Sequence, residues 1–367
     1  MHLYAGYNTT PRGLLSKHPG DSPGFDIRGI FISKPLQKNS FVMRWFQERE
    51  YGRLLEKEIE QFHPDVVISA NTPLDAQALA IRKSREIKAK FIFWLQDLLG
   101  YGAYMILRKK TPGLGHVVGK YYIQLEKSLL KDSDHIVAIS NDYVPVLVEI
   151  GVVKDKISVM ENWAPLDGVS PRPKDNPWAR AHSLHDRFVF LYSGTLGMKH
   201  NPKVFSLLVK SFLDVKAVAV CVISEGVGAE WLKQQKEVEH LNNLDILNYQ
   251  PFDTMSDVLG SGDVLIAILE KDAGVFSVPS KVLTYLCSQR PLLLSVPSEN
   301  LAARIVKENE LGVVVPPGND EEFIEAANKL HKNPSLRWQY AQNARRYAEE
   351  NFDIEKIAVK FLKIILD

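Results

Sequence analysis

The sequence predicts an α/β fold with two doubly wound domains. The chain has 367 residues, which exceeds what a single hydrophobic core usually serves. Short apolar runs rich in valine and isoleucine alternate with longer segments of helical period. The apolar runs are continuous, as in strands covered by helices on both faces, so parallel sheets are expected in both domains.

Each predicted element follows from its local pattern. In the first half of the chain, strands are expected at 64–70, 90–96 and 135–140, and helices at 45–62, 73–86, 115–131 and 141–150. In the second half, strands are expected at 188–194, 217–224, 244–249, 263–269, 291–296 and 312–317.

The domain boundary is predicted from a change in composition. Residues 162–184 hold four prolines and keep no sustained period, which is typical of a linker. The predicted domains are therefore residues 1–165 and 166–351. Residues 352–367 keep an apolar helical stripe and predict a C-terminal helix that crosses back to the first domain.

The composition indicates a soluble globular protein, with 45% hydrophobic and 24% charged residues. No apolar run approaches the ~20 residues of a membrane span, and the start lacks a secretory pattern, so we expect a cytoplasmic location. Cys221 and Cys287 lie in apolar surroundings and are predicted to be buried and free. A net charge of +1 gives no reason to expect a nucleic-acid partner.

Four loops in the second domain follow successive predicted strands. In "YSGTLGMKHNP" (192–202), Gly194 and Gly197 permit close backbone approach, and Lys199 adds a positive charge before a helix. A purely structural turn is the alternative. The second loop is "SEGVGAEW" (224–231), where glycine is equally common in structural turns.

The other two loops add an aromatic ring and a second lysine. The turn "NYQPF" (248–252) offers the Tyr249 ring to a planar base. In "SVPSKVLTYL", Ser280 is placed to cap a helix that begins near Lys281. Because ligands of open α/β sheets bind at the carboxyl ends of strands, the four loops together predict an anion site.

The chain resembles the GT-B glycosyltransferases of the retaining family 4. The resemblance covers nearly the whole chain, and its most specific stretches are "LYSGTLGMKHNP", "LNYQPFDTMSDVLGSGDVLIAIL" and "SVPSKVLTYLCSQRPLLLS". Residues 125–163 also resemble the family's inner strand, helix and domain exit. The stretch "VPSKVLTYL" resembles the corresponding stretch in enzymes of bacterial exopolysaccharide and surface-glycan synthesis, such as colanic-acid fucosyltransferases.

The resemblance implies two Rossmann-like domains facing across a cleft. The second would bind a nucleotide-sugar donor, and the first a glycan or polyprenyl-linked acceptor in surface polysaccharide or lipopolysaccharide biosynthesis. Lys199 matches the lysine that neutralises the donor pyrophosphate, and Ser280 with Lys281 matches the loop around the distal phosphate. The implied donor-binding residues are Gly194, Thr195, Lys199, Glu225, Gly226, Tyr249, Gln250, Phe276, Ser277, Ser280 and Lys281.

Three positions depart from the family pattern. Thr195 stands where many relatives have arginine, and Phe276 and Thr284 stand where many have two glutamates eight positions apart. Because Thr284 replaces the second glutamate, a carboxylate at this position cannot recognise the donor ribose as it does in those relatives. The departures leave open an alternative function, a catalytically weak or inactive GT-B-like subunit that binds nucleotide sugar or recruits a partner. A nucleotide-sugar epimerase would need acids and histidines that these loops lack.

The acceptor-side candidates follow two predicted strands of the first domain. Gln96 and Asp97 end the strand at 90–96, and in the resemblance Asp97 orients the acceptor hydroxyl or accepts its proton. The alternative is that Asp97 caps the next segment. Asn71 and Thr72 follow the strand at 64–70 and are expected to shape the acceptor pocket.

No metal cofactor is expected. Asp132 and Asp134 form a D-x-D pair, but they precede a predicted strand and therefore lie at its amino end. The ten histidines are scattered. Lysines and helix N-termini are expected to stabilise the leaving diphosphate in place of a cation.

Residues 105–131 hold six basic residues, one acid and the pair Tyr121 and Tyr122. Such a mixture suits an anionic membrane interface, so peripheral association with the inner face of the membrane is expected. A solvated helix face is the alternative.

The beginning of the sequence carries a further expectation. Relatives start with a strand, a glycine-rich loop and a helix, whereas "MHLYAGYNTTPRG" resembles their second strand. The first strand, loop and helix are thus expected to be missing from these 367 residues. A genuine start here would loosen the first domain and weaken transfer.

Overall fold

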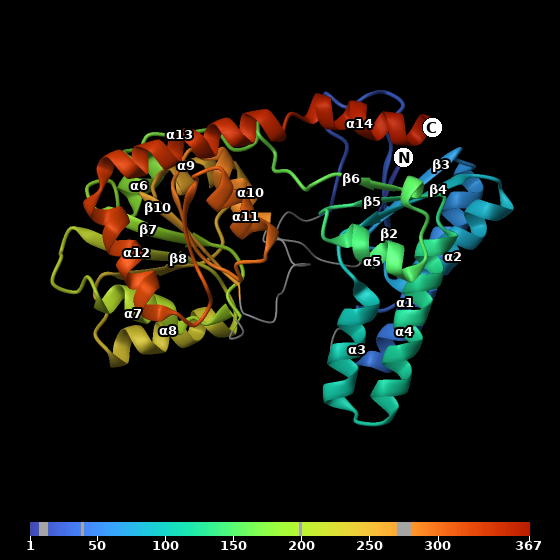
Figure 1. The fold of residues 1–367 in the computed structure, drawn as a ribbon, viewed down its shortest axis with the longest axis horizontal. Coiled ribbons are helices and arrows are strands. Elements are labelled where there is room, and N and C mark those ends of the chain that lie inside the picture. Colours follow the sequence, from blue (N-terminus) through green and yellow to red (C-terminus); the bar gives the residue numbers. More distant parts are fainter. Residues whose placement is uncertain (7–13, 38–39, 198–199, 270–279) are drawn as a thin grey trace. The chain divides into compact units, whose positions relative to one another are not determined.

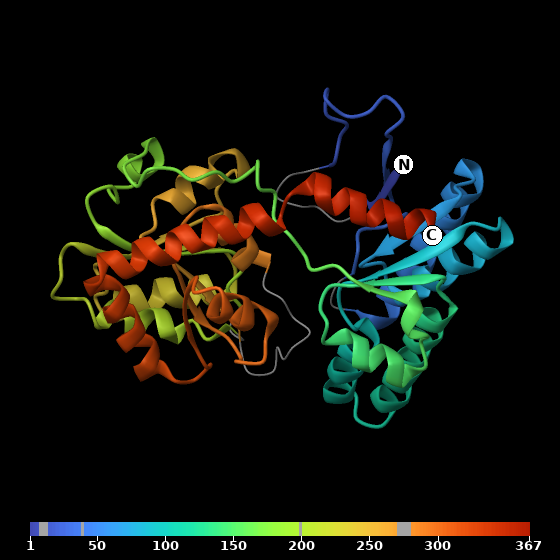
Figure 2. The same ribbon diagram turned by 45° about the horizontal axis from the view of Figure 1, so that its top comes forward.

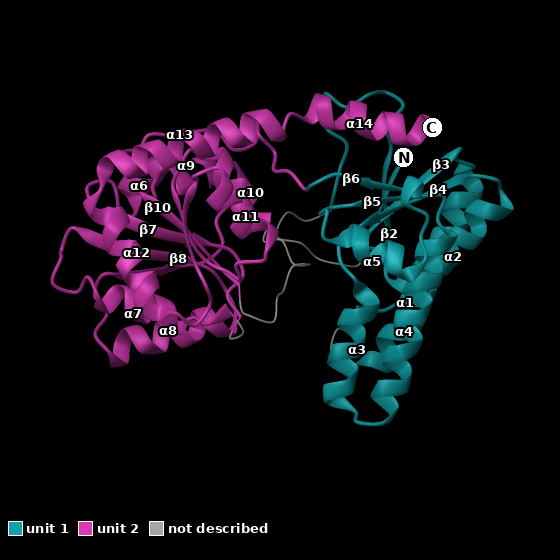
Figure 3. Cartoon of the chain, viewed as in Figure 1, with its two compact units in different colours: residues 1–161 teal, residues 162–367 magenta. Residues whose placement is uncertain are grey.

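The computed structural model describes residues 1–6, 14–37, 40–197, 200–269 and 280–367. The chain divides into two compact units, residues 1–161 and 162–367 (Figure 3). This division falls four residues before the predicted boundary and groups the C-terminal helix with unit 2.

Unit 1 alternates strands and helices along most of its length (Figure 1). Its elements are β1 (His2–Ala5), β2 (Ile27–Ile30), α1 (Phe41–Phe62), β3 (Val66–Ala70), α2 (Leu74–Glu86), β4 (Lys90–Leu95), α3 (Leu99–Lys110), α4 (Leu114–Asp132), β5 (His135–Ala138), α5 (Tyr143–Ile150), the 3₁₀ turn η1 (Lys154–Lys156) and β6 (Ile157–Val159).

Two parallel sheets occur in unit 1. Strands β3, β4, β5 and β6 pair in that order, and β1 pairs with β2 in a separate sheet. Ala70 is in register with Trp94, and Leu95 with Ala138. The loops that follow β3, β4 and β5 therefore leave the sheet at one edge.

Unit 2 is larger and carries a six-stranded sheet. Its elements are α6 (Pro177–Ala181), β7 (Phe188–Ser193), α7 (Lys203–Lys210), β8 (Val218–Ile223), α8 (Val227–Val238), β9 (Leu244–Leu247), the 3₁₀ turn η3 (Phe252–Thr254), α9 (Met255–Gly260), β10 (Val264–Ile268), α10 (Ser280–Cys287), β11 (Leu292–Ser295), α11 (Leu301–Glu308), β12 (Gly312–Val315), α12 (Asp320–Lys332), α13 (Pro334–Asn351) and α14 (Ile354–Leu366).

The sheet of unit 2 reverses its strand order once. The spatial order is β12-β11-β10-β7-β8-β9, with all neighbours parallel. Strands β7, β8 and β9 extend from the middle of the sheet to one edge, and β10, β11 and β12 extend from the middle to the other edge. The loops after β7 and β10 therefore lie on either side of this reversal. Such a switch point is where open α/β sheets bind ligands.

Both faces of this sheet are buried, as the continuous apolar strands predicted. Val189 and Leu191 of β7 join a core with α9, α10, α11 and α13, whereas Phe190 and Tyr192 face α7, α8 and α12. Figure 2 shows α13 lying along unit 2. Cys221 and Cys287 are buried and free, which confirms their predicted core positions.

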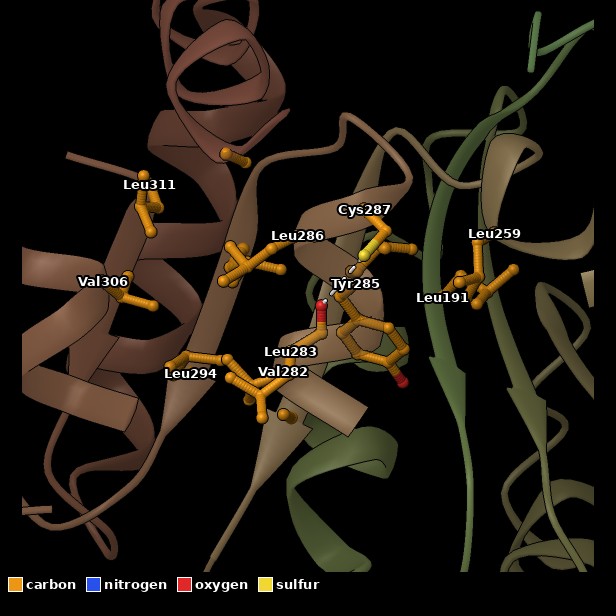
Figure 4. Close-up of a cluster of buried hydrophobic side chains, with 14 of the residues drawn as sticks. Leu191, Leu259, Val282, Leu283, Tyr285, Leu286, Cys287, Leu294, Val306 and Leu311 are labelled. Atoms are coloured by element: carbon orange, nitrogen blue, oxygen red, sulfur yellow. Dashed lines mark hydrogen bonds between the residues drawn. The ribbon is translucent and has the colours of Figure 1, made fainter. Parts of the chain in front are cut away.

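Helix α10 is held by its apolar side. Val282, Leu283 and Leu286 are buried in the same core as Leu294 of β11 (Figure 4). With that side fixed against the sheet, the start of the helix, at Ser280 and Lys281, is held at the carboxyl edge of the strands.

The interpretation of residues 162–184 as a linker was wrong. Ala164, Val169, Trp178 and Leu184 are buried in the core of unit 2. Asn176 caps α6 by accepting a hydrogen bond from the backbone N–H of Ala179. The prolines suppress a regular period, but single apolar side chains at irregular spacing still anchor the segment.

No helix in the described parts of the chain is both long and apolar enough to cross a bilayer.

Candidate functional site

The loop after β7 requires glycine at position 194. Gly194 has a φ of +142°, and its N–H donates to the carbonyl of Ile223 at the end of β8 (3.0 Å). A Cβ at this position would lie 2.9 Å from the Lys281 Nζ atom. The glycine thus lets a lysine from α10 approach the carboxyl end of β7.

Lys281 lies against a tyrosine. Its Nζ donates to the Tyr192 Oη atom (2.5 Å) and lies 3.9 Å from the centre of the Tyr192 ring. Burial lowers the pKa of Lys281 to about 7. No carboxylate in the described residues forms an ion pair with it. A bound anion would therefore supply the missing negative charge.

Tyr192 also fixes the loop that bears Thr195. Its hydroxyl donates to the Thr195 carbonyl (2.7 Å), and the Thr195 Oγ1 atom lies 3.1 Å from the Tyr249 Oη atom. The backbone N–H of Tyr249 donates to the Glu225 Oε1 atom (3.2 Å). These hydrogen bonds join the loops after β7, β8 and β9.

A second tyrosine connects α10 to β7. The Tyr285 hydroxyl donates to the Ser193 carbonyl (3.0 Å) and accepts from the Ser193 N–H (2.9 Å). Because Tyr285 is one helical turn after Lys281, this pair of bonds sets where the lysine lies. Tyr285 was not selected from the sequence, where it looks like an ordinary apolar position of the helix.

Two helices begin at this edge of the sheet. Helix α8 follows Gly226, whose φ of +96° is strained for any other residue, and α10 begins at the exposed Ser280. Free N–H groups and the helix dipole favour anions at such positions. Combined with Lys281, the arrangement is suited to a diphosphate.

Not every predicted donor residue joins this cluster. The side chain of Gln250 accepts from the Trp178 Nε1–H (2.9 Å) and donates to the Asn248 carbonyl (2.9 Å), which are structural contacts. The predicted positions Lys199, Phe276 and Ser277 lie outside the described residues.

In unit 1, Asn71 and Thr72 follow β3. Asn71 has a φ of +51°, which asparagine tolerates better than most residues. The Thr72 Oγ1 atom lies 2.9 Å from the Ser69 Oγ atom, which donates to the Gln77 Oε1 atom (2.6 Å). Hydrogen bonds to β3 and α2 thus hold this loop.

Gln96 and Asp97 follow the neighbouring strand, β4. The Gln96 carbonyl accepts from the Tyr143 hydroxyl (3.0 Å). Asp97 is at the surface, and partial burial of its carboxyl raises its pKa. A raised pKa makes the Asp97 carboxylate a stronger base, which suits a group that takes a proton from a hydroxyl.

The expected alternative for Asp97 was helix capping, but another carboxylate has that position. Helix α3 has no side-chain cap from Leu98, its N-cap residue. The buried Glu126 of α4 instead lies beside the start of α3, where a Cβ at Gly100 would be 2.9 Å from its Oε2 atom and the nearby backbone N–H groups favour its charged form. Burial raises the pKa of Glu126 to about 7. No sequence pattern marked Glu126, because its role depends on how α4 packs against α3.

The D-x-D aspartates have structural contacts. The Asp134 Oδ2 atom accepts from the Phe91 N–H (2.7 Å), and Asp132 pairs with Arg85 (3.1 Å). Over the described ranges no cluster of three His, Cys, Asp or Glu residues is placed to bind a metal ion.

Residues 176–347 match the family model of glycosyl transferases group 1. The chain is 21% identical over 281 residues to WcaI of Escherichia coli, a proposed colanic acid biosynthesis glycosyl transferase, with 76% of this chain and 68% of WcaI covered. It is 22% identical over 294 residues to the uncharacterized glycosyltransferase MJ1069 of Methanocaldococcus jannaschii, with 74% and 72% covered.

The fold has solved counterparts. HepE of Anabaena in complex with UDP-glucose superposes with a TM-score of 0.67 at 13% identity, covering 92% of this chain and 85% of that one. WaaG, a glycosyltransferase involved in lipopolysaccharide biosynthesis, gives a TM-score of 0.63 at 13% identity, covering 90% and 84%. The predicted α/β class with parallel sheets is confirmed, and the fold is GT-B.

Proposed function

We propose that this chain transfers a sugar from a nucleotide-sugar donor to a glycan or polyprenyl-linked acceptor in bacterial surface polysaccharide biosynthesis. The match to glycosyl transferases group 1 supports a glycosyltransferase. The observation that supports a donor site most directly is the position of Lys281 at the sheet's switch point. It is a partly buried cation with no carboxylate partner among the described residues.

The proposed donor site has three parts. Lys281 and the N-termini of α8 and α10 bind the diphosphate, and Lys199 adds a second cation from the loop after β7. Tyr249 stacks on the base, with Thr195 and Glu225 holding the position of its ring and backbone. UDP and UDP-glucose are ligands of HepE, which supports this class of donor.

The proposed transfer needs no divalent metal and retains the anomeric configuration. Lys281, Lys199 and helix N-termini stabilise the charge that develops on the leaving diphosphate. Asp97 orients the acceptor hydroxyl or takes its proton, while Asn71, Thr72 and Gln96 shape the acceptor pocket. We place the enzyme in the cytoplasm, where nucleotide sugars are available to it.

One observation favours a second candidate, a subunit that binds nucleotide sugar without efficient transfer. Thr284 stands where many relatives have a glutamate, and its hydroxyl donates to the Ser280 carbonyl of its own helix (3.4 Å). A carboxylate would accept strong hydrogen bonds from the ribose hydroxyls of the donor. A neutral hydroxyl that already donates to its own helix is a weaker partner.

Transfer and binding can be separated in one experiment. Purified protein is incubated with a panel of nucleotide sugars and membrane-extracted polyprenyl-linked glycans, and released nucleoside diphosphate is measured with and without acceptor. Acceptor-dependent release that is lost in Asp97→Asn supports the transferase. Binding of a nucleotide sugar without acceptor-dependent release supports the second candidate.

A further inference from the structure

A buried carboxylate lies beside the loop that carries the proposed acceptor-side residues. Glu126 of α4 is 4% exposed, and its Oε1 atom has no hydrogen-bond partner among the described residues. Burial of a carboxylate is costly unless the group is paired or fully hydrogen-bonded. For stability alone, an apolar side chain of similar size would serve as well or better. The presence of the carboxylate therefore indicates a role other than stability.

Packing places Glu126 against the first turn of α3. A Cβ at Gly100 would lie 2.9 Å from the Glu126 Oε2 atom and 2.6 Å from the Tyr122 carbonyl oxygen. Burial raises the pKa of Glu126, but the backbone N–H groups of this turn favour its charged form. The N-cap residue of α3 supplies no side-chain cap. A side chain of α4 thus serves the free N–H groups that an N-cap residue usually serves.

Close packing of α3 on α4 extends along both helices (Figure 1). A Cβ at Gly119 would lie 2.8 Å from the Tyr104 Cα atom, and a Cβ at Gly115 would lie 2.1 Å from the Leu107 carbonyl oxygen. Because these glycines bring the two backbones together, α3 cannot shift along α4 without losing the contacts. The position of α4 therefore sets the position of the first turn of α3.

The first turn of α3 continues directly from the loop that bears Asp97. Helix α3 begins at Leu99, whose N–H donates to the Asp97 carbonyl (3.1 Å). The Gly102 N–H donates to the carbonyl of Leu98, the single residue between Asp97 and the helix (3.0 Å). A movement of this turn would consequently displace the Asp97 carboxylate.

Helix α5 holds the same loop from its other end. Tyr143 is fully buried, and its hydroxyl donates to the Gln96 carbonyl (3.0 Å). Burial, and then the charges of carboxylates that include Asp97 and Glu126, raise the pKa of Tyr143. Tyr143 therefore lies near both carboxylates. The loop is held by α5 at Gln96 and by α4 at the start of α3.

We propose that Glu126 is a positioning residue of the transfer reaction, whose carboxylate holds the first turn of α3 and thereby fixes Asp97 for the acceptor hydroxyl. The proposal rests on the proposed function, because Asp97 has this role only if the chain transfers a sugar to an acceptor. Glu126 is buried, so it acts through Asp97 and not on the substrate. A misplacement of about 1 Å can lower a rate on the order of 100-fold, so a small shift of the turn is sufficient.

Three variants of the full-length protein test the proposal. Glu126→Leu removes the accepting oxygens with little change in volume, and Glu126→Gln keeps one of them. Asp75→Asn is the matched control. Asp75 is also buried, at 5% exposure, but it lies on α2 and accepts from the hydroxyl of Tyr122, one helical turn before Glu126 (2.8 Å). Asparagine keeps an oxygen that can accept this bond.

Each variant is measured in three ways. Transfer kinetics use the nucleotide sugar and the membrane-extracted acceptor that give transfer in the wild type. Thermal denaturation with and without nucleoside diphosphate reports on stability and on unit 2. Hydrogen exchange followed by mass spectrometry reports on the backbone of residues 97–102.

The expected result separates activity from stability. Glu126→Leu should melt at or above the wild-type temperature, yet its kcat should fall tenfold or more, on the order of the loss that a sub-ångström misplacement causes. The KM for nucleotide sugar and the diphosphate shift should stay unchanged, and residues 97–102 should exchange faster. Glu126→Gln should lose less, and Asp75→Asn should behave like the wild type.

A wild-type kcat in Glu126→Leu, or unchanged exchange at residues 97–102, would overturn the proposal. If Glu126→Leu does not fold, Glu126→Gln decides, since a neutral amide oxygen is a weaker acceptor than a carboxylate. A kcat and an exchange rate equal to those of the wild type in that variant would also overturn it.

Hydrogen exchange distinguishes this proposal from the proposed function, because it needs no acceptor. If the wild type transfers no sugar but exchange at residues 97–102 rises in Glu126→Leu, the proposed function fails, and with it the role in transfer, whereas the hold of Glu126 on α3 stands. If the wild type transfers sugar and the variant changes neither kcat nor exchange, the proposed function stands and the positioning role fails.

Discussion

The ammonium group of Lys281 lies over the ring of Tyr192 and donates to its hydroxyl (2.5 Å), at the carboxyl end of the central strand β7. The tyrosine offers a π face and an oxygen but no negative charge. Burial consequently lowers the pKa of Lys281 from 10.5 to about 7. A lysine of this kind is costly to the free protein and is stabilised by an anionic ligand.

The first prediction concerns stability and pH. Below pH 7 the lysine is charged in both the folded and unfolded states, so its burial lowers the free energy of unfolding. Between pH 7 and about 10.4 the unfolded state binds more protons, and this cost declines as the pH rises. Lys281→Met should therefore be more stable than the wild type, most clearly at pH 6 and least at pH 10. Thermal denaturation at several pH values measures this, and a difference that grows with pH would contradict it.

Diphosphate binding should take up protons. A bound anion raises the pKa of Lys281, so at pH 8 the complex holds protons that the free protein lacks. Calorimetry with UDP in buffers of different ionisation enthalpy should show this uptake for the wild type and not for Lys281→Met. Affinity should fall as the pH rises above 7, and an affinity independent of pH between 6 and 9 argues against the assignment.

Glu126 should make the stability of unit 1 depend on pH. Its pKa is raised from 4.5 to about 7, so the folded state binds more protons than the unfolded state between these values, and stability is lost as the pH rises through this range. Glu126→Gln removes the titration and should gain stability relative to the wild type between pH 5 and pH 8. Chemical denaturation at pH 5 and pH 8 measures the difference in the free energy of unfolding between Glu126→Gln and the wild type. The same difference at both pH values would contradict this prediction.

Gly194→Ala should damage the proposed donor site. The added Cβ lies 2.9 Å from the Lys281 Nζ atom, and the φ of +142° is strained for alanine. We expect a lower melting temperature and weaker binding of nucleoside diphosphates. Gly102→Ala is the matched control, because no atom lies within 4 Å of its Cβ and it is in a helix, where alanine is favoured by ~1 kcal/mol. Normal diphosphate binding by Gly194→Ala would show that this approach of Lys281 is not needed.

Transfer should not depend on a divalent metal. Lys281, Lys199 and the helix N-termini are proposed to stabilise the leaving diphosphate in place of a divalent cation. Activity should therefore persist in EDTA and increase little with Mn²⁺ or Mg²⁺. A transfer assay with each addition measures this. Activity lost in EDTA and restored by Mn²⁺ would exclude the proposed mechanism.

The fold could be predicted from the sequence because its strands are continuous apolar runs. "FVFLYSG" and "AVAVCVIS" became β7 and β8 within a residue or two of the expected ends. Helix α3 was missed because its apolar positions mix with glycines at Gly100 and Gly102, which weaken the helical signal.

The candidate site could be predicted only where residues follow strands. Gly194, Tyr249 and Lys281 were chosen on that basis, whereas Thr195 and Glu225 came from the family resemblance. The structure joins these residues through contacts that include the Tyr192 hydroxyl. The residues that hold them in place were not foreseen, because Tyr192 and Tyr285 look like ordinary core positions in the sequence. Only tertiary packing places their hydroxyls against Lys281 and Ser193.

The most direct test of the donor site is a thermal-shift measurement with a panel of nucleoside diphosphates, made on the wild type, Lys281→Met and the exposed-site control Lys329→Met. Binding to the native state alone raises the melting temperature by mass action. We predict that at least one diphosphate stabilises the wild type and Lys329→Met, and that the shift is lost in Lys281→Met. No shift with any diphosphate, or an equal shift in all three proteins, would contradict the proposed donor site.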